Sequence, residues 1–268
     1  MNKGTAFITG ASSGIGAAFA RRLAADGFHI VAHGRRENLL RQLCEQLSTR
    51  YPVRAEYVTA ELADPAQLLA LEKRVRSTPE LTLLVNNAGF STIRLFHEET
   101  SDSQDEMILT HVNATVRLTH AALGGMLQRG AGAIINVSSV AGFLISPGST
   151  TYCSTKAFLT TFTESLHLEL RDKGIRMQAL CPGFTTSDFH KKLGYDITQP
   201  AFRRFMPAET VVEASLRALE RGKVVCIPGW QYKAAALLGR WMPRVLLYAV
   251  VGLGRKAGVP RRPEPAVP

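Results

Sequence analysis

A tyrosine and a lysine four residues apart form a candidate site for proton exchange. Tyr152 precedes Lys156 by four residues, and Ser139 lies 13 residues before the tyrosine. Positions i and i+4 of a helix lie on the same face, so the phenol and the ammonium would stand side by side. A free tyrosine has a pKa of about 10, and a neighbouring cation favours the phenolate and lowers that pKa. The spacing therefore predicts proton exchange with an alcohol or carbonyl oxygen, although the same spacing also occurs on solvated surface helices.

A glycine-rich loop near the N-terminus indicates a nucleotide site. It reads Thr-Gly-Ala-Ser-Ser-Gly-Ile-Gly over residues 9–16, between a short apolar run and an amphipathic segment. Glycines permit a tight turn and let backbone N–H groups approach a pyrophosphate, and a helix N-terminus adds partial positive charge. A loop in this position favours dinucleotide binding over an ordinary turn. We assign cofactor contacts to Gly10, Ser12, Ser13, Gly14, Ile15 and Gly16.

Two arginines follow the second apolar run and bear on the choice of cofactor. Gly34 occupies the place where NAD-selective enzymes usually carry an acid for the ribose 2′-hydroxyl, and Arg35 and Arg36 come next. A guanidinium can bind a 2′-phosphate through two hydrogen bonds, which a carboxylate would repel. We therefore predict NADP(H), with Arg35 as the leading contact and Arg36 as the second. The alternative is that both arginines are solvated at the start of a helix, where their charge opposes the helix dipole.

These residues are embedded in an alternation of short apolar runs and amphipathic segments. We expect strands at residues 5–9, 29–33, 54–59, 81–86, 133–137, 176–181 and 224–227. We expect helices at residues 15–26, 37–50, 65–77, 103–129, 151–173 and 208–221. Nearly continuous apolar strands such as residues 81–85 are typical of parallel sheets covered on both faces. The alternation predicts an α/β fold, a doubly wound parallel sheet of about seven strands with helices on both faces.

Composition and charge exclude several classes of protein. Of the 268 residues, 46% are hydrophobic and 20% are charged, which suits one large globular domain or two small ones. The four cysteines are widely spaced without a Cys-x-x-Cys, so we predict no metal ion and a cytoplasmic location. No apolar stretch reaches the about 20 residues of a transmembrane helix. Of the net charge of +10, the last 41 residues carry +6, a distribution that argues against nucleic-acid binding.

The ordered motifs of the chain resemble those of the short-chain dehydrogenase/reductase family in its form of about 250 residues. The resemblance covers residues 4–229. The motifs are the loop at 9–16, Asn86-Asn87-Ala88-Gly89, Asn113, Ser139, Tyr152-x-x-x-Lys156 and Pro182-Gly183. The resemblance implies that this region is a Rossmann-fold catalytic domain. It also implies that Tyr152 is the general acid/base.

The resemblance assigns roles to the other motif residues. Lys156 would lower the pKa of Tyr152 and bind the nicotinamide ribose, Ser139 would bind the substrate oxygen, and Asn113 would hold a water linking Lys156 to solvent, unless it is an ordinary polar helix residue. Further cofactor contacts fall on Asn87, Ala88, Gly89, Pro182, Gly183 and Thr185.

The chain departs from the family pattern at two places. The family often has Asp after the third strand to contact adenine, whereas this chain has Glu61 and Leu62, so the side-chain contact is in doubt. Ser187 replaces a frequent Thr five residues after Pro182 and keeps its hydroxyl.

The resemblance implies reversible hydride transfer between NADP(H) and a carbonyl or alcohol group. We expect the substrate to be a small hydrophobic ketone or aldehyde, lipid-like or polycyclic. Two alternatives stay open. One is a protein that binds NADPH as a regulator or scaffold without turnover, and the other is a reductase of imines or activated C=C bonds.

The segment after Pro182-Gly183 is where this family places much of its substrate contact. Residues 184–206 mix four phenylalanines with four cations, which suits an apolar substrate that carries an anionic group. A solvated lid would have the same composition. The side chains are Phe184, Phe189, Phe202, Phe205, Lys191, Lys192, Arg203 and Arg204.

The C-terminal residues form a hydrophobic and basic extension beyond the family core. Residues 230–258 combine tryptophan, leucine and valine with arginine, and we expect helix there, followed by a disordered tail at 259–268. Such helices suit packing on the body, on a partner subunit or at the substrate mouth, and equally suit contact with the inner face of an anionic membrane.

A stripe on the helix that carries Tyr152 is relevant to assembly. Phe158, Phe162, Leu166 and Leu170 recur at intervals of four and belong either to the core or to a subunit interface. From the resemblance we expect a homodimer or homotetramer.

Overall fold

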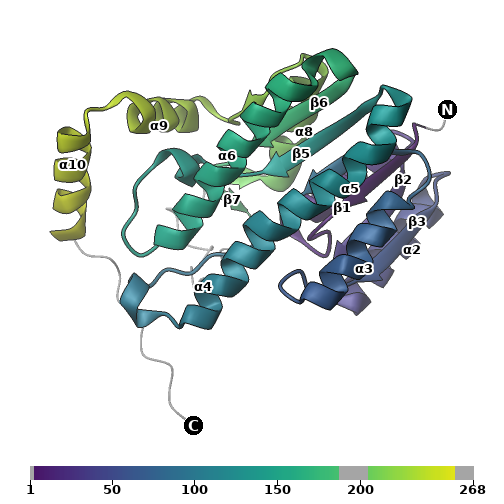
Figure 1. Ribbon diagram of the computed structural model, residues 1–268, viewed down its shortest axis with the longest axis horizontal. Helices are drawn as coiled ribbons and strands as arrows, with labels where there is room; N and C mark the ends of the chain where they lie inside the picture. Colours follow the sequence, from purple (N-terminus) through teal and green to yellow (C-terminus); the bar gives the residue numbers. More distant parts are fainter. Residues whose placement is uncertain (1–2, 187–204, 257–268) are drawn as a thin grey trace, which may run out of the picture.

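The computed structural model describes residues 3–186 and 205–256, and seven parallel strands form its central sheet (Figure 1). The strands are β1 (Thr5–Ile8), β2 (His29–Gly34), β3 (Ala55–Thr59), β4 (Leu81–Asn86), β5 (Gly132–Val137), β6 (Ile175–Leu180) and β9 (Val225–Cys226). Their order in space is β3-β2-β1-β4-β5-β6-β9. The chain moves outward from β1 to β3 and then resumes on the other side of β1 at β4, so the order reverses between β1 and β4. The predicted α/β fold with a doubly wound parallel sheet is confirmed.

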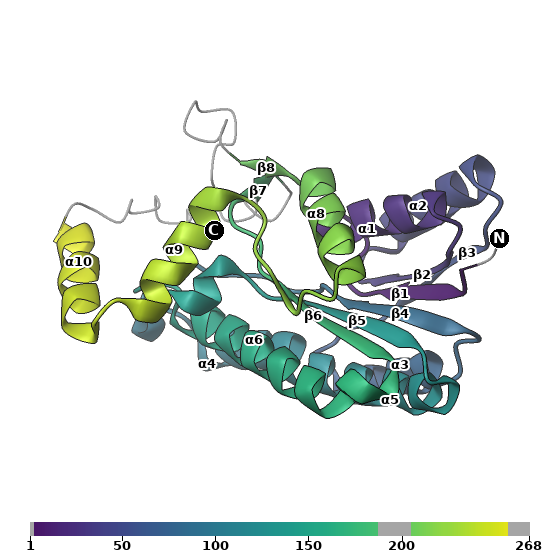
Figure 2. The same cartoon turned by 90° about the horizontal axis from the view of Figure 1, so that it is seen from above.

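Helices cover both faces of this sheet (Figure 2). On one face lie α1 (Gly14–Ala25), α2 (Glu37–Arg50) and α8 (Ala208–Glu220). On the other lie α3 (Pro65–Arg76), α4 (Ser101–Ile108), α5 (Ala114–Arg129) and α6 (Thr150–Leu170). Short pieces complete the description: η1 (Phe96–Glu98), η2 (Leu109–Asn113), η3 (Val140–Phe143), η4 (Arg171–Lys173), β7 (Thr185–Thr186) and β8 (Met206–Pro207).

The alternation of side chains along β1 divides the core into two layers. Ala6 and Ile8 pack in the cluster that includes α1, α2 and α8, whereas Phe7 packs with residues of α3 and α5 on the opposite face. All three side chains are fully buried. Successive residues of a strand point to opposite faces, so one apolar strand supplies both layers, as its continuous hydrophobicity predicts.

The helix expected over residues 103–129 is interrupted, which corrects the prediction. A π-helical turn, η2, separates α4 from α5 and carries Thr110, His111 and Asn113. A π turn adds one residue to the helical repeat and occurs often at functional sites. The turn buries His111, which is bonded to Phe90 N and to Thr155 Oγ1. Apolar periodicity continues through the turn, so the sequence pattern gave no sign of it.

The C-terminal extension consists of α9 (Trp230–Trp241) and α10 (Arg244–Lys256), confirming the expected helices there. Helix α9 packs on η3, and the approach is close, since a Cβ at Gly239 would lie 2.2 Å from the carbonyl oxygen of Phe143. Helix α10 lies at the end of the molecule, away from the sheet (Figures 1 and 2). Among the described residues, no helix is both long and apolar enough to cross a membrane. The expected tail at 259–268 lies outside the described residues.

Candidate active site

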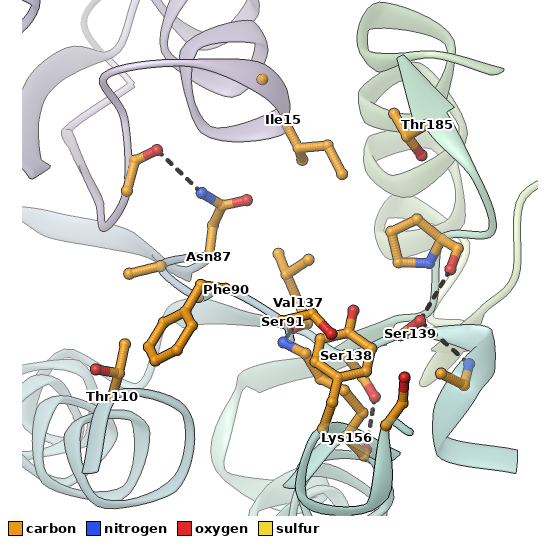
Figure 3. A pocket seen from close by; sticks show the side chains of 18 of the residues that line it. Ile15, Asn87, Phe90, Ser91, Thr110, Val137, Ser138, Ser139, Lys156 and Thr185 are labelled. Atoms are coloured by element: carbon orange, nitrogen blue, oxygen red, sulfur yellow. Dashed lines mark hydrogen bonds between the residues drawn. The ribbon is translucent and has the colours of Figure 1, made fainter. Parts of the chain in front are cut away.

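A cavity of about 730 Å³ lies at the carboxyl ends of the strands (Figure 3). Its walls include residues that directly follow β1, β2, β4, β5 and β6, because parallel strands bring their C-terminal ends to one edge of the sheet. Many of the residues predicted for cofactor and catalysis meet here. Those that line the cavity are Gly10, Ser12, Ser13, Gly14, Ile15, Arg35, Arg36, Glu61, Leu62, Asn87, Ala88, Gly89, Ser139, Tyr152, Lys156, Pro182, Gly183 and Thr185.

The glycine-rich loop and the turn after β4 hold each other in place. Thr9 Oγ1 accepts hydrogen bonds from the N–H groups of Asn87 and Ala88, at 2.9 and 3.0 Å. Asn87 Nδ2 donates back to the carbonyl oxygens of Thr9 and Gly10. The loop has no room for side chains, since a Cβ at Gly16 would lie 2.3 Å from the oxygen of Gly10. Gly16 therefore lets the start of α1 pack closely against the loop.

The start of α1 is open to an anion. Ser13 is the N-cap residue, but its side chain makes no capping bond to the helix. First-turn N–H groups without capping partners, together with the positive end of the helix dipole, make a site for a phosphate. The residues at this end of the cavity therefore fit a pyrophosphate.

Tyr152, Ser139 and Lys156 lie at the other end of the cavity. The Ser139 hydroxyl caps η3 by accepting from Ala141 N at 3.1 Å, and it is hydrogen-bonded to the Tyr152 phenol. Its neighbour Ser138 is buried and donates to the carbonyl oxygen of Lys156 at 2.6 Å. The two serines thus differ: Ser138 fixes α6 against the sheet, and Ser139 reaches the phenol.

Burial has the largest effect on the pKa values of Tyr152 and Lys156. Burial raises the pKa of Tyr152 to about 12, and the hydrogen bond with Ser139 acts in the opposite direction. Burial also lowers the pKa of Lys156 to about 8. The ammonium donates to the carbonyl oxygen of Val137 at 2.8 Å and lies 5.6 Å from the centre of the Tyr152 ring. Desolvation is therefore the largest influence on the pKa of Tyr152 in this structure, and the lowering of that pKa by Lys156 stays a prediction.

Asn113 does not line the cavity, whereas His111 from the same turn contacts Tyr152. Asn113 ends the π turn and is not among the residues that line the cavity. His111 from the same turn lies against Tyr152 edge-on, with ring centres 5.9 Å apart. Phe90 N donates to His111 Nε2, so Nδ1 carries the proton and donates to Thr155 Oγ1. Burial keeps the pKa of His111 well below its usual value, so the ring is neutral.

The comparisons with known proteins agree with this geometry. The sequence model of the short chain dehydrogenase family matches residues 4–197. A short-chain dehydrogenase from Sphingobium yanoikuyae in complex with NADPH has 34% sequence identity and a TM-score of 0.81, covering 97% of this chain and 98% of that one. The bulky-bulky ketone specific alcohol dehydrogenase from Comamonas testosteroni has 32% identity and a TM-score of 0.78, covering 98% of each chain. The very-long-chain 3-oxoacyl-CoA reductase of Anas platyrhynchos is 30% identical over 85% of this chain and 74% of its own length.

The chain belongs to the short-chain dehydrogenase family. Members of this family are oxidoreductases that bind a nicotinamide cofactor and act on carbonyl or alcohol groups. The likeness to the two solved structures extends over nearly the whole chain, so it includes the C-terminal extension.

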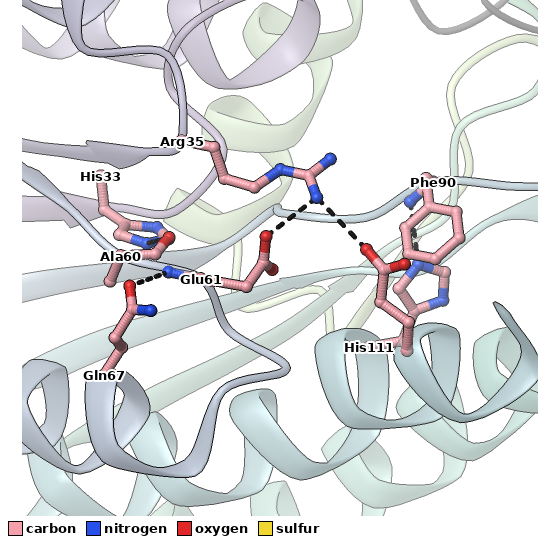
Figure 4. Close-up of polar contacts among 8 residues, drawn as sticks. His33, Arg35, Ala60, Glu61, Gln67, Phe90 and His111 are labelled. Carbon is pink, nitrogen blue, oxygen red and sulfur yellow. Dashed lines mark hydrogen bonds and ion pairs between the residues drawn. The ribbon is translucent and has the colours of Figure 1, made fainter. Parts of the chain in front are cut away.

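The two arginines of this short-chain dehydrogenase have different partners. Arg35 Nη1 forms ion pairs with Glu61 at 2.9 Å and with Glu106 at 3.2 Å (Figure 4). Arg36 instead donates to the hydroxyls of Ser12 and Ser13, at 3.1 and 2.7 Å. The departure noted at Glu61 therefore has a structural consequence, because its carboxylate neutralises the arginine that the sequence ranks first. Glu106, on α4, could not be connected with Arg35 from the sequence because 71 residues separate them.

The extension of this short-chain dehydrogenase reaches the active-site cavity. Tyr232 and Ala235 of α9 line it, and a Cβ at Gly183 would lie 2.2 Å from the Tyr232 ring. The Tyr232 hydroxyl donates to the carbonyl oxygen of Phe184 at 3.4 Å. Of the places considered for the extension, packing on the body and at the substrate mouth are both observed for α9. Tyr232 had no motif of its own in the sequence.

The remaining wall of the cavity is largely apolar. The apolar residues that line it include Phe90, Ile93, Leu144, Pro147 and Cys153. Phe184 stacks on Phe205, with ring centres 5.1 Å apart. The other predicted substrate contacts, Phe189, Lys191, Lys192, Phe202, Arg203 and Arg204, lie outside the described residues, as does Ser187.

Proposed function

We propose that this short-chain dehydrogenase uses NADP(H) to reduce a bulky apolar ketone or aldehyde to an alcohol. One observation carries the proposal: a single cavity joins Arg36, Ser12 and Ser13 at one end to Ser139 and Tyr152 at the other. The first group suits a phosphate on the adenosine ribose, and the second suits a carbonyl oxygen. A dinucleotide that spans these ends would bring its nicotinamide to Tyr152.

The residues present fit NADP(H). The open N-terminus of α1 and the close-packed glycines suit the pyrophosphate. Arg36 is the leading candidate for the 2′-phosphate, because its guanidinium and the two serine hydroxyls converge on one point. Arg35 is the second, since Glu61 and Glu106 compete with a phosphate for it. The Sphingobium yanoikuyae relative, solved in complex with NADPH, supports this choice.

The residues around Tyr152 account for the proton transfer. When bound, the cofactor would supply a hydride to the carbonyl carbon. The carbonyl oxygen would then take the phenol proton of Tyr152, whose raised pKa of about 12 means that the phenol carries its proton before the transfer. The Ser139 hydroxyl donates to the same oxygen and stabilises its developing charge. The phenolate left on Tyr152 lies near the Lys156 ammonium, which stabilises it until solvent returns a proton.

Five residues have further roles in this proposal. The Lys156 ammonium can also donate hydrogen bonds to the nicotinamide ribose. Pro182, Gly183 and Thr185 line the same end of the cavity. Asn113 is proposed to hold water behind Lys156, as in its family, from its place at the end of the π turn.

Three observations favour a bulky apolar substrate. The cavity that contains Tyr152 is also lined by Phe90, Ile93, Leu144 and Tyr232. The Comamonas testosteroni relative is specific for bulky-bulky ketones, and the Anas platyrhynchos relative reduces a very-long-chain 3-oxoacyl-CoA. A large, hydrophobic carbonyl compound fits all three.

The test is NADPH oxidation with a series of ketones and aldehydes of increasing size. We expect kcat/KM to rise from acetone to aryl alkyl ketones, because the apolar wall binds the added carbons. Tight NADPH binding without turnover on any carbonyl would instead favour a regulatory protein or a reductase of imines or activated C=C bonds. Equal kcat/KM with NADH and NADPH would contradict the cofactor assignment.

A homodimer or homotetramer is part of the proposal. Phe158 is exposed on α6 beside Phe162, with the rings stacked 5.7 Å apart, and Leu168 is exposed further along, whereas Leu170 is buried. Leu170 thus belongs to the core, and Phe158 remains for a subunit contact. The four cysteines are free and buried, which is compatible with the cytoplasm that we propose as the location. Analytical ultracentrifugation of the native chain and of Phe158→Glu tests the assembly.

A further inference from the structure

The C-terminal extension exposes an unusual amount of apolar surface. Eight of the eighteen large hydrophobic side chains that are exposed in the described part of the chain lie between residues 230 and 250. We call these the extension surface: Trp230, Leu237, Leu238, Trp241, Val245, Leu246, Tyr248 and Val250. Trp230 is 80% exposed, Trp241 75% and Val245 78%. A concentration of exposed apolar side chains of this kind indicates a surface that another body covers.

The helical repeat of α9 separates this surface from the protein body. Trp230, Leu237 and Trp241 recur at intervals of seven and four, so they share one face of the helix. Ala236 and Gly239, which are buried against the body, lie on the opposite face. Helix α9 therefore has one face for the protein and another that the described residues leave uncovered.

The charge around the extension surface has one sign. The sequence has no Asp or Glu between Glu220 and Glu264, whereas it has nine Lys or Arg in that interval. Lys233 and Arg240 lie beside the apolar face of α9, and Arg244 begins α10. Apolar and aromatic side chains flanked by cations match the apolar interior and anionic headgroups of a bilayer surface.

A second copy of the chain is a poorer match for the same surface. A two-fold contact centred on the extension would place the extension of one protomer against that of its partner. Both extensions carry only positive charge, so such a contact would bring like charges together as it buries the apolar residues. Charge complementarity thus favours an anionic bilayer over a second copy of the chain as the body that covers the extension surface.

We propose that the extension surface docks on an anionic lipid bilayer, with α9 and α10 lying at the headgroup level. The inner face of α9 carries Tyr232 and Ala235, which line the active-site cavity. Docking would therefore hold the substrate entrance close to the bilayer, where apolar carbonyl compounds concentrate. The docking itself does not depend on the proposed reaction, because it needs only the exposed side chains of the extension.

Vesicle flotation of the full-length protein tests this proposal. Phosphatidylcholine vesicles with and without phosphatidylglycerol are compared at low and at high salt. We expect binding to be at least about tenfold stronger with the anionic lipid, and we expect salt to weaken it because the cations are screened. The double variant Trp241→Glu/Leu246→Glu should bind the anionic vesicles at least about tenfold more weakly than the native protein. The double variant Arg240→Glu/Arg244→Glu should bind vesicles with and without phosphatidylglycerol equally.

A matched control and a second readout make the result decisive. Leu168→Glu, at a side chain 65% exposed on α6, should leave vesicle binding unchanged. NADPH oxidation with a water-soluble ketone should be the same in all these variants, so loss of docking and loss of turnover are separate outcomes. The proposal is overturned if the native chain does not bind anionic vesicles. It is equally overturned if the double variant Trp241→Glu/Leu246→Glu keeps vesicle binding. If this double variant changes only the molar mass measured by ultracentrifugation, the extension surface is a contact between two copies of the chain, and the proposal is again overturned.

Discussion

The ring of Tyr232 lies directly against the α-carbon of Gly183, so a Cβ at position 183 would meet the ring at 2.2 Å. This contact connects α9 of the C-terminal extension with the turn that is proposed to frame the nicotinamide. A side chain at position 183 would displace either the ring or the turn. The extension is thereby part of the active site as well as an appendage to the fold.

A double-mutant cycle tests that contact. We expect Gly183→Ala to lower kcat/KM for a bulky ketone by about tenfold or more, since a misplacement near the reacting centre is costly. Adding Tyr232→Ala should restore part of the loss, because the clash is then removed. Gly124→Ala, on α5 where a Cβ meets no atom within 4 Å, is the control and should leave kcat/KM unchanged. Additive losses in the double variant would contradict the account.

The partners of the two arginines predict different effects on the choice of cofactor. Arg36→Ala should lower kcat/KM for NADPH by about 100-fold, the equivalent of about 3 kcal/mol for a charge-assisted hydrogen bond, and should leave NADH almost unaffected. Arg35→Ala should have a smaller effect, because Glu61 and Glu106 already neutralise that guanidinium. Steady-state kinetics with both cofactors measures this. A larger NADPH defect in Arg35→Ala would restore the order that the sequence suggested.

Most of the fold could be predicted from the sequence, because the strands are apolar and short and the glycine loop follows the first of them. The predicted strand limits agree with β1 to β6 and β9 within one residue at each end. The π turn at Leu109–Asn113 was missed because the apolar pattern continues through it. Tyr232 and Glu106 were missed because contacts between distant segments leave no local pattern.

Some of the residues of the candidate active site could be predicted from the sequence and others could not. Tyr152, Ser139 and Lys156 have family motifs and meet in the cavity, but their pKa values depend on burial, which a motif does not reveal. His111 has no motif, yet it bridges the turn after β4 and helix α6.

Removing the His111 bridge should cost stability. In His111→Leu, the part-buried N–H of Phe90 would lose its acceptor, at a cost of about 1–3 kcal/mol, and the Thr155 hydroxyl would lose its donor while still donating to the carbonyl oxygen of Tyr152. We therefore expect a fall of about 2 kcal/mol or more in the free energy of unfolding, measured with urea. His120→Leu, at an exposed position on α5, should change it by less than about 0.5 kcal/mol. Equal effects would show that the bridge contributes nothing.

Lys156 should make stability rise with pH. Its pKa is about 8 in the folded protein and 10.5 ordinarily, so between these values the unfolded chain binds more protons. The free energy of unfolding should therefore increase by about 2 kcal/mol between pH 7.5 and pH 9.5 through this group, at 1.36 kcal/mol per unit of pKa shift. The contribution of Lys156 is measured as the difference in the free energy of unfolding between the native chain and Lys156→Met at each pH. Two parallel pH profiles would mean that the ammonium is not desolvated.

Transfer of deuterium from 4,4-dideuterated NADPH to a bulky aryl ketone tests the central claim most directly, with the native protein and Tyr152→Phe compared by mass spectrometry. The account predicts an alcohol with deuterium on its carbinol carbon from the native protein. It also predicts at least about 100-fold slower formation by Tyr152→Phe, with NADPH binding retained. Product formed without deuterium, or a variant as fast as the native protein, would contradict the assignment of Tyr152 as the proton donor in a hydride transfer.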